Sequence, residues 1–188
     1  MAEMDSLEEK TLHTEQIFSG NIIELQVDDV ELPNGEKSKR EIVKHPGAVA
    51  IIPFSEDGGM YLVEQYRKPL EKTIIEIPAG KMEPGEDPLV TARRELEEET
   101  GFQSDDLTYL TSFYTSPGFA NELLHIYVAR DLRKMEQPLA QDADEFINLV
   151  KVTPEEAEQL IEQQFIHDAK TMYAMQYWKL QLLIEENE

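Results

Sequence analysis

The chain has 188 residues, a length that suits one domain or one domain with a modest extension. About 40% of the residues are hydrophobic and 8% are aromatic, which is enough for a packed core and excludes disorder throughout the chain. With 39 acidic against 17 basic residues the net charge is −22, and such a surface repels nucleic acid and anionic membranes. A small phosphate ester stays compatible with this charge if metal ions and a few arginines supply local positive charge.

The N-terminal part predicts a β extension. Residues 1–9 form an acidic tail that lacks the basic start and apolar stretch of a signal peptide. No apolar run approaches the length of a transmembrane helix, so we expect a cytoplasmic protein without a membrane partner. The absence of cysteine excludes disulfides and cysteine–zinc sites. Because residues 11–45 show strand patterns around a turn at 33–35, we divide the chain into an N-terminal β extension, 1–45, and a main domain, 46–188.

The main domain alternates strand patterns with three helix patterns. Strands are expected at 48–54, 60–66, 73–77, 107–114, 123–130 and 146–152. Helices are expected from the cap Asp87 to the stop Gly101, from the cap Thr153 to about 165, and from the cap Asp168 to about 185. This order predicts an α+β fold or an α/β/α sandwich, with a mixed β-sheet between helices.

Three glutamates share one face of the first expected helix. Glu95, Glu98 and Glu99 lie at positions i, i+3 and i+4, where like charges repel. The last two also lie in the final turn, where the helix dipole favours cations. A divalent cation would reverse both penalties, and oxygen ligands without nearby cysteine or histidine favour Mg²⁺ or Mn²⁺ over zinc. The alternative is a solvated acidic face in a chain that is acidic everywhere.

The spacing around these glutamates resembles the Nudix box, G-x5-E-x7-R-E-U-x-E-E-x-G-U, where U is aliphatic or aromatic. The matching positions are Gly80, Glu86, Arg94, Glu95, Leu96, Glu98, Glu99, Gly101 and Phe102. Nine specified positions over 23 residues make this a specific signal. The resemblance implies an enzyme in which water attacks a diphosphate with the help of Mg²⁺, or of Mn²⁺ as a substitute.

The resemblance to the Nudix family also implies roles for single residues. The implied metal ligands are the Ala79 carbonyl, Glu95, Glu98, Glu99 and Glu145. Glu86 and Arg94 would pair and fix the loop against the helix, and Gly80 would permit the sharp entry to that loop. Similar enzymes carry a catalytic glutamate in a mobile acidic loop, and the segment 141–146 favours Glu145 as the general base. Asp142 and Asp144 are the fallbacks, and a solvated acidic loop is the alternative.

Segments outside the box resemble one branch of the family, the bacterial ADP-ribose pyrophosphatases. They are Pro117-Gly118, which begins 16 residues beyond Gly101, and the stretches KREIVKHPGAVA, EQYRKP and EIPAGK. The branch implies hydrolysis of ADP-ribose to AMP and ribose 5-phosphate. The alternatives are another nucleoside diphosphate sugar, with GDP-mannose or a flavin dinucleotide less favoured, and a Nudix domain that senses a nucleotide without cleaving it. The retained glutamates favour an enzyme.

Arginines matter because a phosphate dianion must approach a negative surface. A guanidinium offers a fork that matches phosphate oxygens, so Arg40 and Arg67 are candidates for binding phosphate or ribose, with surface salt bridges as the alternative. The full set of expected substrate-binding residues is Arg40, Arg67, Lys81, Pro117, Gly118 and Glu122. In the resembled branch the N-terminal extension pairs with a second subunit. We therefore expect a homodimer in which Arg40 serves its own site or the other subunit's site.

Overall fold

The computed structural model describes residues 7–141 and 145–187, and the chain divides into two compact units. The first unit contains residues 1–47 together with 113–124, and the second contains the rest of the chain. The sequence places 113–124 in the main domain, whereas the structure groups it with the N-terminal extension. The cause is a pair of backbone hydrogen bonds, because Val43 donates to the Phe119 carbonyl and accepts from the amide of Asn121.

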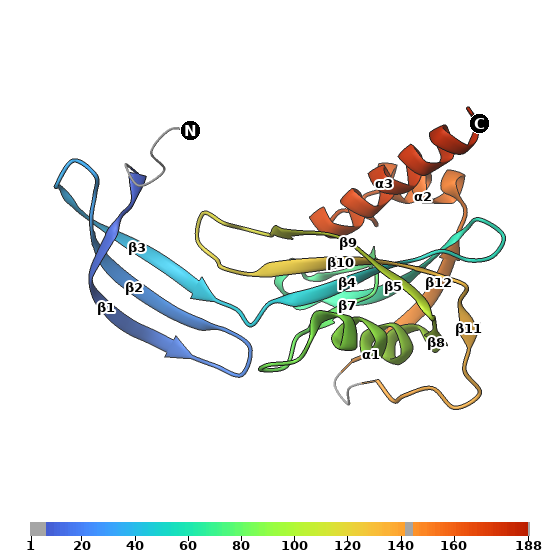
Figure 1. The fold of residues 1–188 in the computed structure, drawn as a ribbon, viewed down its shortest axis with the longest axis horizontal. Coiled ribbons are helices and arrows are strands. Elements are labelled where there is room, and N and C mark those ends of the chain that lie inside the picture. The colour runs from blue at the N-terminus through green and yellow to red at the C-terminus, as the bar shows by residue number, and fades with distance from the viewer. Residues whose placement is uncertain (1–6, 142–144, 188) are drawn as a thin grey trace. The chain divides into compact units, whose positions relative to one another are not determined.

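An antiparallel sheet of three strands makes up most of the first unit. In order across the sheet the strands are β1 (Lys10–Ser19), β2 (Glu24–Glu31) and β3 (Lys37–Lys44) (Figure 1). Every residue of β1 is exposed, whereas β2 buries Asp28 and Val30. Asp28 accepts hydrogen bonds from the hydroxyls of Thr11 and Thr14, which ties β1 to β2. The predicted antiparallel N-terminal strands are confirmed.

The second unit is built on two main sheets and one short ladder. The first sheet has the order β7 (Ala79–Lys81), β4 (Ala48–Pro53), β10 (Leu123–Arg130) and β9 (Asp106–Tyr114). The second sheet is antiparallel, with the order β12 (Ile147–Val152), β5 (Met60–Arg67) and β6 (Lys72–Glu76). The ladder pairs β8 (Phe102–Gln103) with β11 (Arg133–Lys134). A 3-10 turn at Lys68–Leu70 connects β5 to β6.

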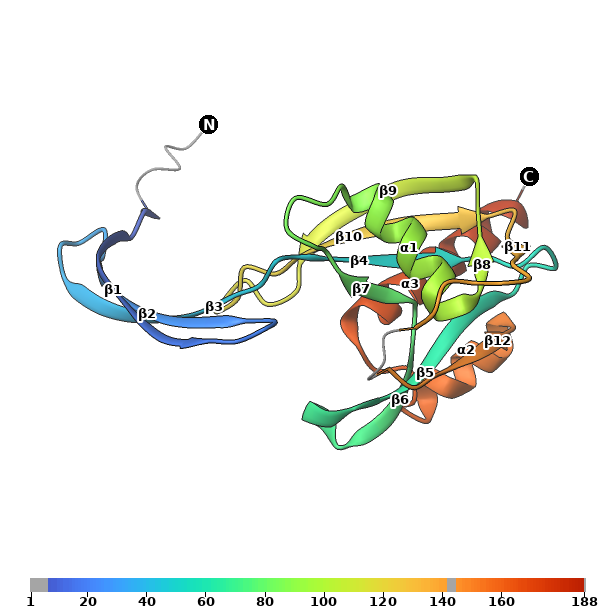
Figure 2. The ribbon, with the colours of Figure 1, turned by 90° about the horizontal axis from the view of Figure 1, so that it is seen from below.

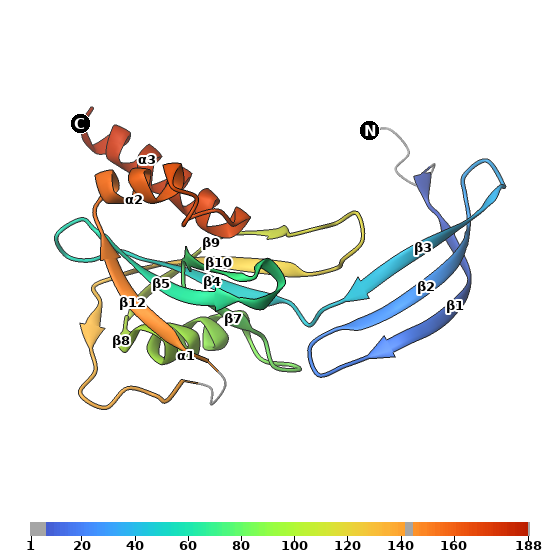
Figure 3. The same ribbon diagram turned by 180° about the vertical axis from the view of Figure 1, so that it is seen from behind.

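Helices lie on both sides of the sheets of the second unit. Helix α1 (Pro88–Thr100) lies on one side, and α2 (Pro154–Glu162) and α3 (Ala169–Glu185) lie on the other (Figures 2 and 3). The core beneath α1 consists of Val49, Ile51, Ala92, Leu96, Tyr127 and Ala129. On the other side, Phe54 contacts the rings of Tyr177 and Trp178 from α3. The predicted sandwich of sheet between helices is confirmed.

The three helices begin at their predicted caps. Asp87 accepts a hydrogen bond from the Leu89 amide, Thr153 forms a capping box, and Asp168 accepts from the Thr171 amide. Helix α2 ends at Glu162, three residues before the predicted end at 165, and Gln164 adopts a left-handed φ of 60°. In the described part of the chain, no helix is long and apolar enough to cross a membrane.

Two short strands lie outside the strands expected from the sequence. Residues 79–81, just beyond the expected strand 73–77, form β7 and pair with β4. The connection between β10 and β12 likewise contains β11. Strands of two or three residues carry too few side chains to produce an alternating pattern, so the sequence does not reveal them.

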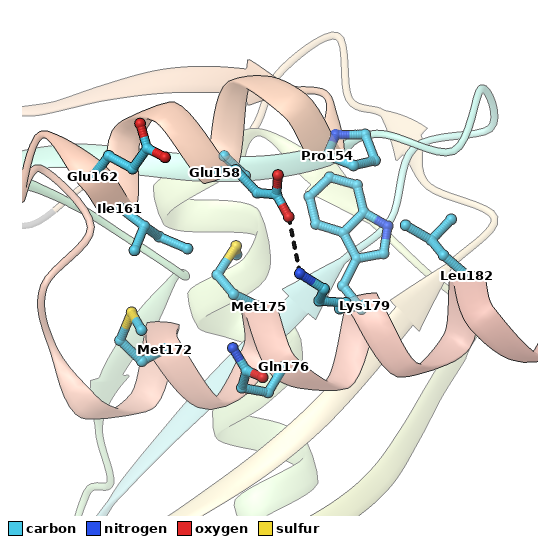
Figure 4. A pocket seen from close by; sticks show the side chains of 11 residues that line it. Pro154, Glu158, Ile161, Glu162, Met172, Met175, Gln176, Lys179 and Leu182 are labelled. Atoms are coloured by element: carbon cyan, nitrogen blue, oxygen red, sulfur yellow. Dashed lines mark hydrogen bonds and ion pairs between the residues drawn. The ribbon is translucent and has the colours of Figure 1, made fainter.

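Helices α2 and α3 pack together around a pocket of about 380 Å³ (Figure 4). Its apolar lining includes Ile161, Met172, Met175, Trp178 and Leu182. Lys179 of α3 pairs with Glu158 of α2 at 3.0 Å, and both side chains are mostly exposed. This ion pair therefore joins the two helices at the protein surface.

Candidate active site

Helix α1 presents the predicted carboxylates to the sheet. Ala92 and Leu96 are buried in the core with residues of β4, and this packing fixes the rotation of the helix about its axis. Glu95 and Glu99 lie one turn apart on the neighbouring stripe and are only 7% and 4% exposed. The helix ends at Gly101, whose φ of 72° is left-handed and whose amide donates to the Glu97 carbonyl. The carboxylate face of Glu95, Glu98 and Glu99 thus ends at a defined helix terminus.

Burial changes the protonation of two of these carboxyls. The pKa of Glu99 is raised to about 8, chiefly by burial and also by the charges of Glu95 and Glu145, while a hydrogen bond from the Ala79 amide at 2.9 Å opposes the rise. Burial also raises the pKa of Glu95 to about 7, against the charge of Arg94. Glu95 and Glu99 lie close together and both resist ionisation. A bound cation would stabilise their anionic forms, because its positive charge offsets the repulsion between them.

Arg94 lies among the carboxylates of the box. Its Nη2 is 3.2 Å from Glu86 Oε2, so the expected pairing of Arg94 with Glu86 is present. Its Nη1 also donates to Glu95 at 2.7 Å and to Glu98 at 2.9 Å, two contacts that the sequence did not predict. Burial opposes the charge of Arg94, but these carboxylates raise its pKa, and Arg94 in turn lowers the pKa of Glu86. Arg94 therefore joins the loop before α1 to the carboxylate face.

Gly80 lies beside the Glu95 carboxylate. A Cβ built on Gly80 would overlap the carboxyl carbon and both oxygens of Glu95. Gly80 is part of β7 and is not among the glycines with a left-handed φ. The sequence explained this glycine by a sharp loop entry. The structure gives a different reason, which is the close approach of a side chain from α1 to the backbone of β7.

Arg67 occupies the end of β5 and pairs with Glu76 at the end of β6. Its Nε donates to one carboxylate oxygen at 2.6 Å and its Nη2 donates to the other at 3.0 Å. The hydrogen bond to Glu76 raises the pKa of Arg67, and the charge of Glu99 adds to the effect. Arg67 therefore lies within electrostatic range of the carboxylate face. Lys81 is exposed at the end of β7, and its carbonyl accepts from Arg94 at 3.3 Å.

Four of the expected substrate-binding residues belong to the first unit: Arg40, Pro117, Gly118 and Glu122. The guanidinium of Arg40 pairs with both oxygens of Glu9, at 2.7 and 2.5 Å. Glu122 accepts a hydrogen bond from the Thr115 hydroxyl at 2.5 Å. The structure thus places Arg67 and Lys81 in the unit of the carboxylate face, and the other four in the unit of the N-terminal sheet.

Of the three acidic residues in the loop at 141–146, the structure describes Glu145, while Asp142 and Asp144 lie outside the described residues. The charge of Glu145 raises the pKa of both Glu95 and Glu99. Its carboxylate is therefore within electrostatic range of the carboxylate face, although it lies 46 residues beyond Glu99 along the chain.

The donor chemistry of the face fits a hard divalent cation. All candidate side-chain ligands are carboxylates, and two of them are buried with raised pKa values. As they stand, no three acidic or histidine side chains within 7–141 and 145–187 form a ready ligand set. Arg94 donates to Glu95 and Glu98 and the Ala79 amide donates to Glu99, so one oxygen of each glutamate already has a hydrogen-bond donor.

Comparison with known families agrees with this site. Residues 44–174 match the family model described as the NUDIX domain, which covers the whole carboxylate face. Residues 9–43 match the model described as the nucleoside diphosphate sugar hydrolase N-terminal domain. The chain belongs to the Nudix family, as the box predicted.

Individual relatives are similar along nearly the whole chain. A methanol dehydrogenase activator of Bacillus methanolicus is 60% identical over 174 residues, covering 93% of this chain and 94% of the relative. An ADP-ribose pyrophosphatase of Bacillus subtilis is 57% identical over 177 residues, covering 94% and 96%. A solved structure of an ADP compounds hydrolase has a TM-score of 0.81 at 25% identity, covering 95% and 96%. The predicted likeness to the bacterial ADP-ribose pyrophosphatase branch is confirmed.

Three residues near the site had no predicted role. Glu76 stands in the EIPAGK stretch, and Lys170 and Thr171 begin the last helix. Lys170 contacts Glu76, and the Thr171 hydroxyl accepts from the Ile77 amide at 3.0 Å. Both contacts join positions 94 residues apart in sequence, so no local pattern indicates them.

Proposed function

We propose that this protein hydrolyses the pyrophosphate bond of ADP-ribose, giving AMP and ribose 5-phosphate, in a Mg²⁺-dependent reaction. The observation that carries the proposal is the convergence of Glu95, Glu98 and Glu99 on one face of α1. Arg94 donates to Glu95 and Glu98, and the Ala79 amide donates to Glu99. The 57% identity to an ADP-ribose pyrophosphatase supports the substrate. The N-terminal match to nucleoside diphosphate sugar hydrolases supports the wider class of substrates.

The proposed metal ligands are the Ala79 carbonyl, Glu95, Glu98, Glu99 and Glu145. A bound Mg²⁺, or Mn²⁺ in its place, would polarise phosphoryl oxygens, lower the pKa of the attacking water and neutralise the leaving phosphate. The purely oxygen donor set supports these ions over zinc.

The remaining chemistry falls to side chains of the protein. Glu145 would accept the proton of the attacking water, since its charge already acts on Glu95 and Glu99. Arg67 would bind phosphoryl oxygens through the part of the guanidinium that Glu76 does not use. Arg94 would hold the loop before α1 against the carboxylate face, because it pairs with Glu86 of the loop and with Glu98 of the helix.

The rest of the substrate-binding set is Arg40, Lys81, Pro117, Gly118 and Glu122. Because Arg40 pairs with Glu9, substrate binding through Arg40 would exchange one anionic partner for another.

We also propose a homodimer formed through the N-terminal extension. Its support is the fully exposed strand β1 with its apolar side chains.

Activation of a dehydrogenase is a second candidate function. The observation that favours it is the 60% identity to a methanol dehydrogenase activator, which extends over nearly as much of the chain as the likeness to the pyrophosphatase. A methanol dehydrogenase assayed with and without this protein tests the candidate. An unchanged dehydrogenase rate removes it.

A substrate panel tests the leading proposal. ADP-ribose, GDP-mannose, other nucleoside diphosphate sugars and a flavin dinucleotide are compared at matched concentration with Mg²⁺, with phosphate measured after phosphatase treatment. We expect ADP-ribose to give the highest kcat/KM, and chelation by EDTA to abolish turnover until Mg²⁺ is restored. Turnover of another substrate with none of ADP-ribose would overturn the substrate but keep the reaction.

The Glu99→Gln variant tests whether the carboxylate face binds the metal. It keeps the hydrogen bond from the Ala79 amide but removes the charge. We expect a loss of turnover by orders of magnitude with an intact fold, and loss of the Mg²⁺-dependent rise in melting temperature. Near-normal activity in this variant would exclude the metal-face mechanism.

A further inference from the structure

A buried carboxylate connects three elements of the second unit. Glu76 ends β6 and is only 2% exposed. Arg67 reaches it from the end of β5, and the strand register puts both side chains on the same face of the sheet. Lys170, in the first turn of α3, contacts the same carboxylate. A buried glutamate that pairs with two cations is fixed in position, because burial without partners is costly.

The first turn of α3 contacts the backbone at the end of β6 as well as the Glu76 side chain. Lys170 Nζ is also 3.0 Å from Asp168 Oδ1, and Asp168 is the N-cap of the helix. Thr171 is fully buried, and its hydroxyl accepts from the amide of Ile77. Residues 76 and 77 are therefore bound by successive residues of one helical turn. This contact fixes the end of β6 to α3.

The same segment leads directly to the carboxylate face. Two residues beyond Ile77, the Ala79 amide donates to Glu99 at 2.9 Å. On the Glu76 side, the guanidinium of Arg67 lies within electrostatic range of Glu99. Its fork to Glu76 uses Nε and Nη2, so Nη1 takes no part in the fork, and 39% of the Arg67 side chain is exposed. The orientation of Nη1 therefore depends on where Glu76 is held.

We propose that Lys170 is a positioning residue for substrate binding, which acts through Glu76 to hold the Arg67 guanidinium toward the phosphoryl groups of the substrate. The inference rests on the proposed function, in which Arg67 binds those groups. Lys170 is itself 14% exposed and already bonded to Glu76 and Asp168, so its role is indirect. Without Lys170, Glu76 has one cation fewer, and the Glu76–Arg67 pair is free to change its orientation.

Kinetics of five variants test the proposal, three of them single changes at Lys170 and Lys179 and the other two Arg67→Met with and without Lys170→Met. Lys170→Met removes the charge and Lys170→Arg keeps it, while Lys179→Met removes an exposed ion pair from the same helix, with side chains 62% and 65% exposed. We expect Lys170→Met to raise KM roughly 10-fold with a smaller change in kcat, Lys170→Arg to recover most of the loss, and Lys179→Met to match the wild type. In an Arg67→Met background, Lys170→Met should cause no further loss of kcat/KM.

A second measurement does not depend on turnover. In ¹⁵N NMR spectra the Arg67 Nε–H, assigned by its loss in Arg67→Met, should exchange slowly with water in the wild type because Glu76 binds it. Lys170→Met should speed this exchange and Lys179→Met should not. If Lys170→Met fails to fold, Lys170→Gln, which keeps a donor without the charge, takes its place.

The two measurements separate the failure of this inference from the failure of the proposed function. Additive losses in Lys170→Met and Arg67→Met, or unchanged Arg67 Nε–H exchange in Lys170→Met, would overturn the positioning role. Absence of ADP-ribose turnover in the wild type would overturn the proposed substrate, and the exchange measurement would still decide whether Lys170 fixes Arg67.

Discussion

Gly80 and Glu95 show how much of the candidate site depends on single-atom contacts. The Glu95 carboxylate lies where a Cβ on Gly80 would be, and it also accepts a hydrogen bond from Arg94. Because Glu95 is nearly buried and its partners come from different elements, it has little room to shift. We expect the position of this proposed metal ligand to be sensitive to the addition of one methyl group.

We expect Gly80→Ala to lower kcat/KM by about 100-fold, because a 1 Å displacement at a reacting centre has effects of that order. Overpacking should also reduce the free energy of unfolding by about 1–3 kcal/mol. Steady-state kinetics and urea unfolding measure the two effects. Gly85→Ala is the control: its φ of 81° makes alanine strained, but no atom lies within 4 Å of the new Cβ. It should lose stability and keep kcat, and equal kinetic losses in both variants would contradict the steric explanation.

Glu145→Gln tests the general base. Its carboxylate acts on Glu95 and Glu99, so we expect loss of the charge to lower kcat far more than it changes KM. Glu136→Gln is the matched control, since Glu136 is an exposed carboxylate of the same connection. An effect of Glu145→Gln on KM alone would reassign Glu145 to substrate binding.

At the scale of elements, Glu76 joins β5, β6 and α3 through one carboxylate. Arg67, Lys170 and Glu76 come from three different elements, and their charges meet at the buried carboxylate of Glu76. Burial raises the pKa of Glu76, but the hydrogen bond from Arg67 and the charges of Lys170 and Arg67 outweigh burial and lower it from 4.5. The folded protein therefore prefers the anion more strongly than the unfolded chain does.

This shift predicts a specific acid dependence of stability. A group with a depressed pKa stabilises the fold above its unfolded value, here 4.5, and the contribution is lost as pH falls through the lower folded value. We expect Glu76→Gln to cost about 3 kcal/mol at pH 7, because one partner of a buried ion pair is removed. Urea unfolding across a pH series should show this cost shrinking below pH 4.5.

The exposed carboxylate of Glu158, in its ion pair with Lys179, provides the comparison. Glu158→Gln should change the free energy of unfolding by less than about 0.5 kcal/mol at any pH. A pH-independent cost for Glu76→Gln would mean that its role is packing rather than charge.

At the scale of the whole molecule, the N-terminal sheet exposes apolar side chains along its outer strand. Strand β1 of the first unit exposes Leu12, Ile17 and Phe18, which are 49%, 50% and 53% exposed. A sheet with one fully exposed outer strand presents free backbone groups and apolar side chains to a second chain. These features suit the proposed interface between two copies of this protein.

We expect the wild type to be a dimer in light scattering coupled to size-exclusion chromatography, and Ile17→Glu to shift it toward the monomer, because a charge would be buried at the interface. Leu180→Glu adds the same charge at a side chain of α3 that is 54% exposed, and should leave the dimer intact. A wild type that is monomeric at every concentration tested would contradict the proposed assembly.

The sequence by itself determined the elements and the reaction. Alternation, caps and turn residues act over a few neighbouring positions, so the local residue pattern is enough to identify Asp87, Thr153 and Asp168 as helix caps. The Nudix box is also contiguous, and its nine positions indicate the carboxylate face on α1. Residues 68–70, β7 and β11 escape prediction because they are too short for a periodic pattern.

Tertiary structure decided which of these residues meet. Only the folded chain shows that Arg94 binds Glu95 and Glu98 as well as Glu86, and that Gly80 is required by the approach of Glu95. Lys170 and Glu76 are 94 residues apart, and 113–124 groups with the N-terminal unit. Such contacts depend on how separate elements pack, and packing is set by the whole core, so no local stretch of sequence can encode them.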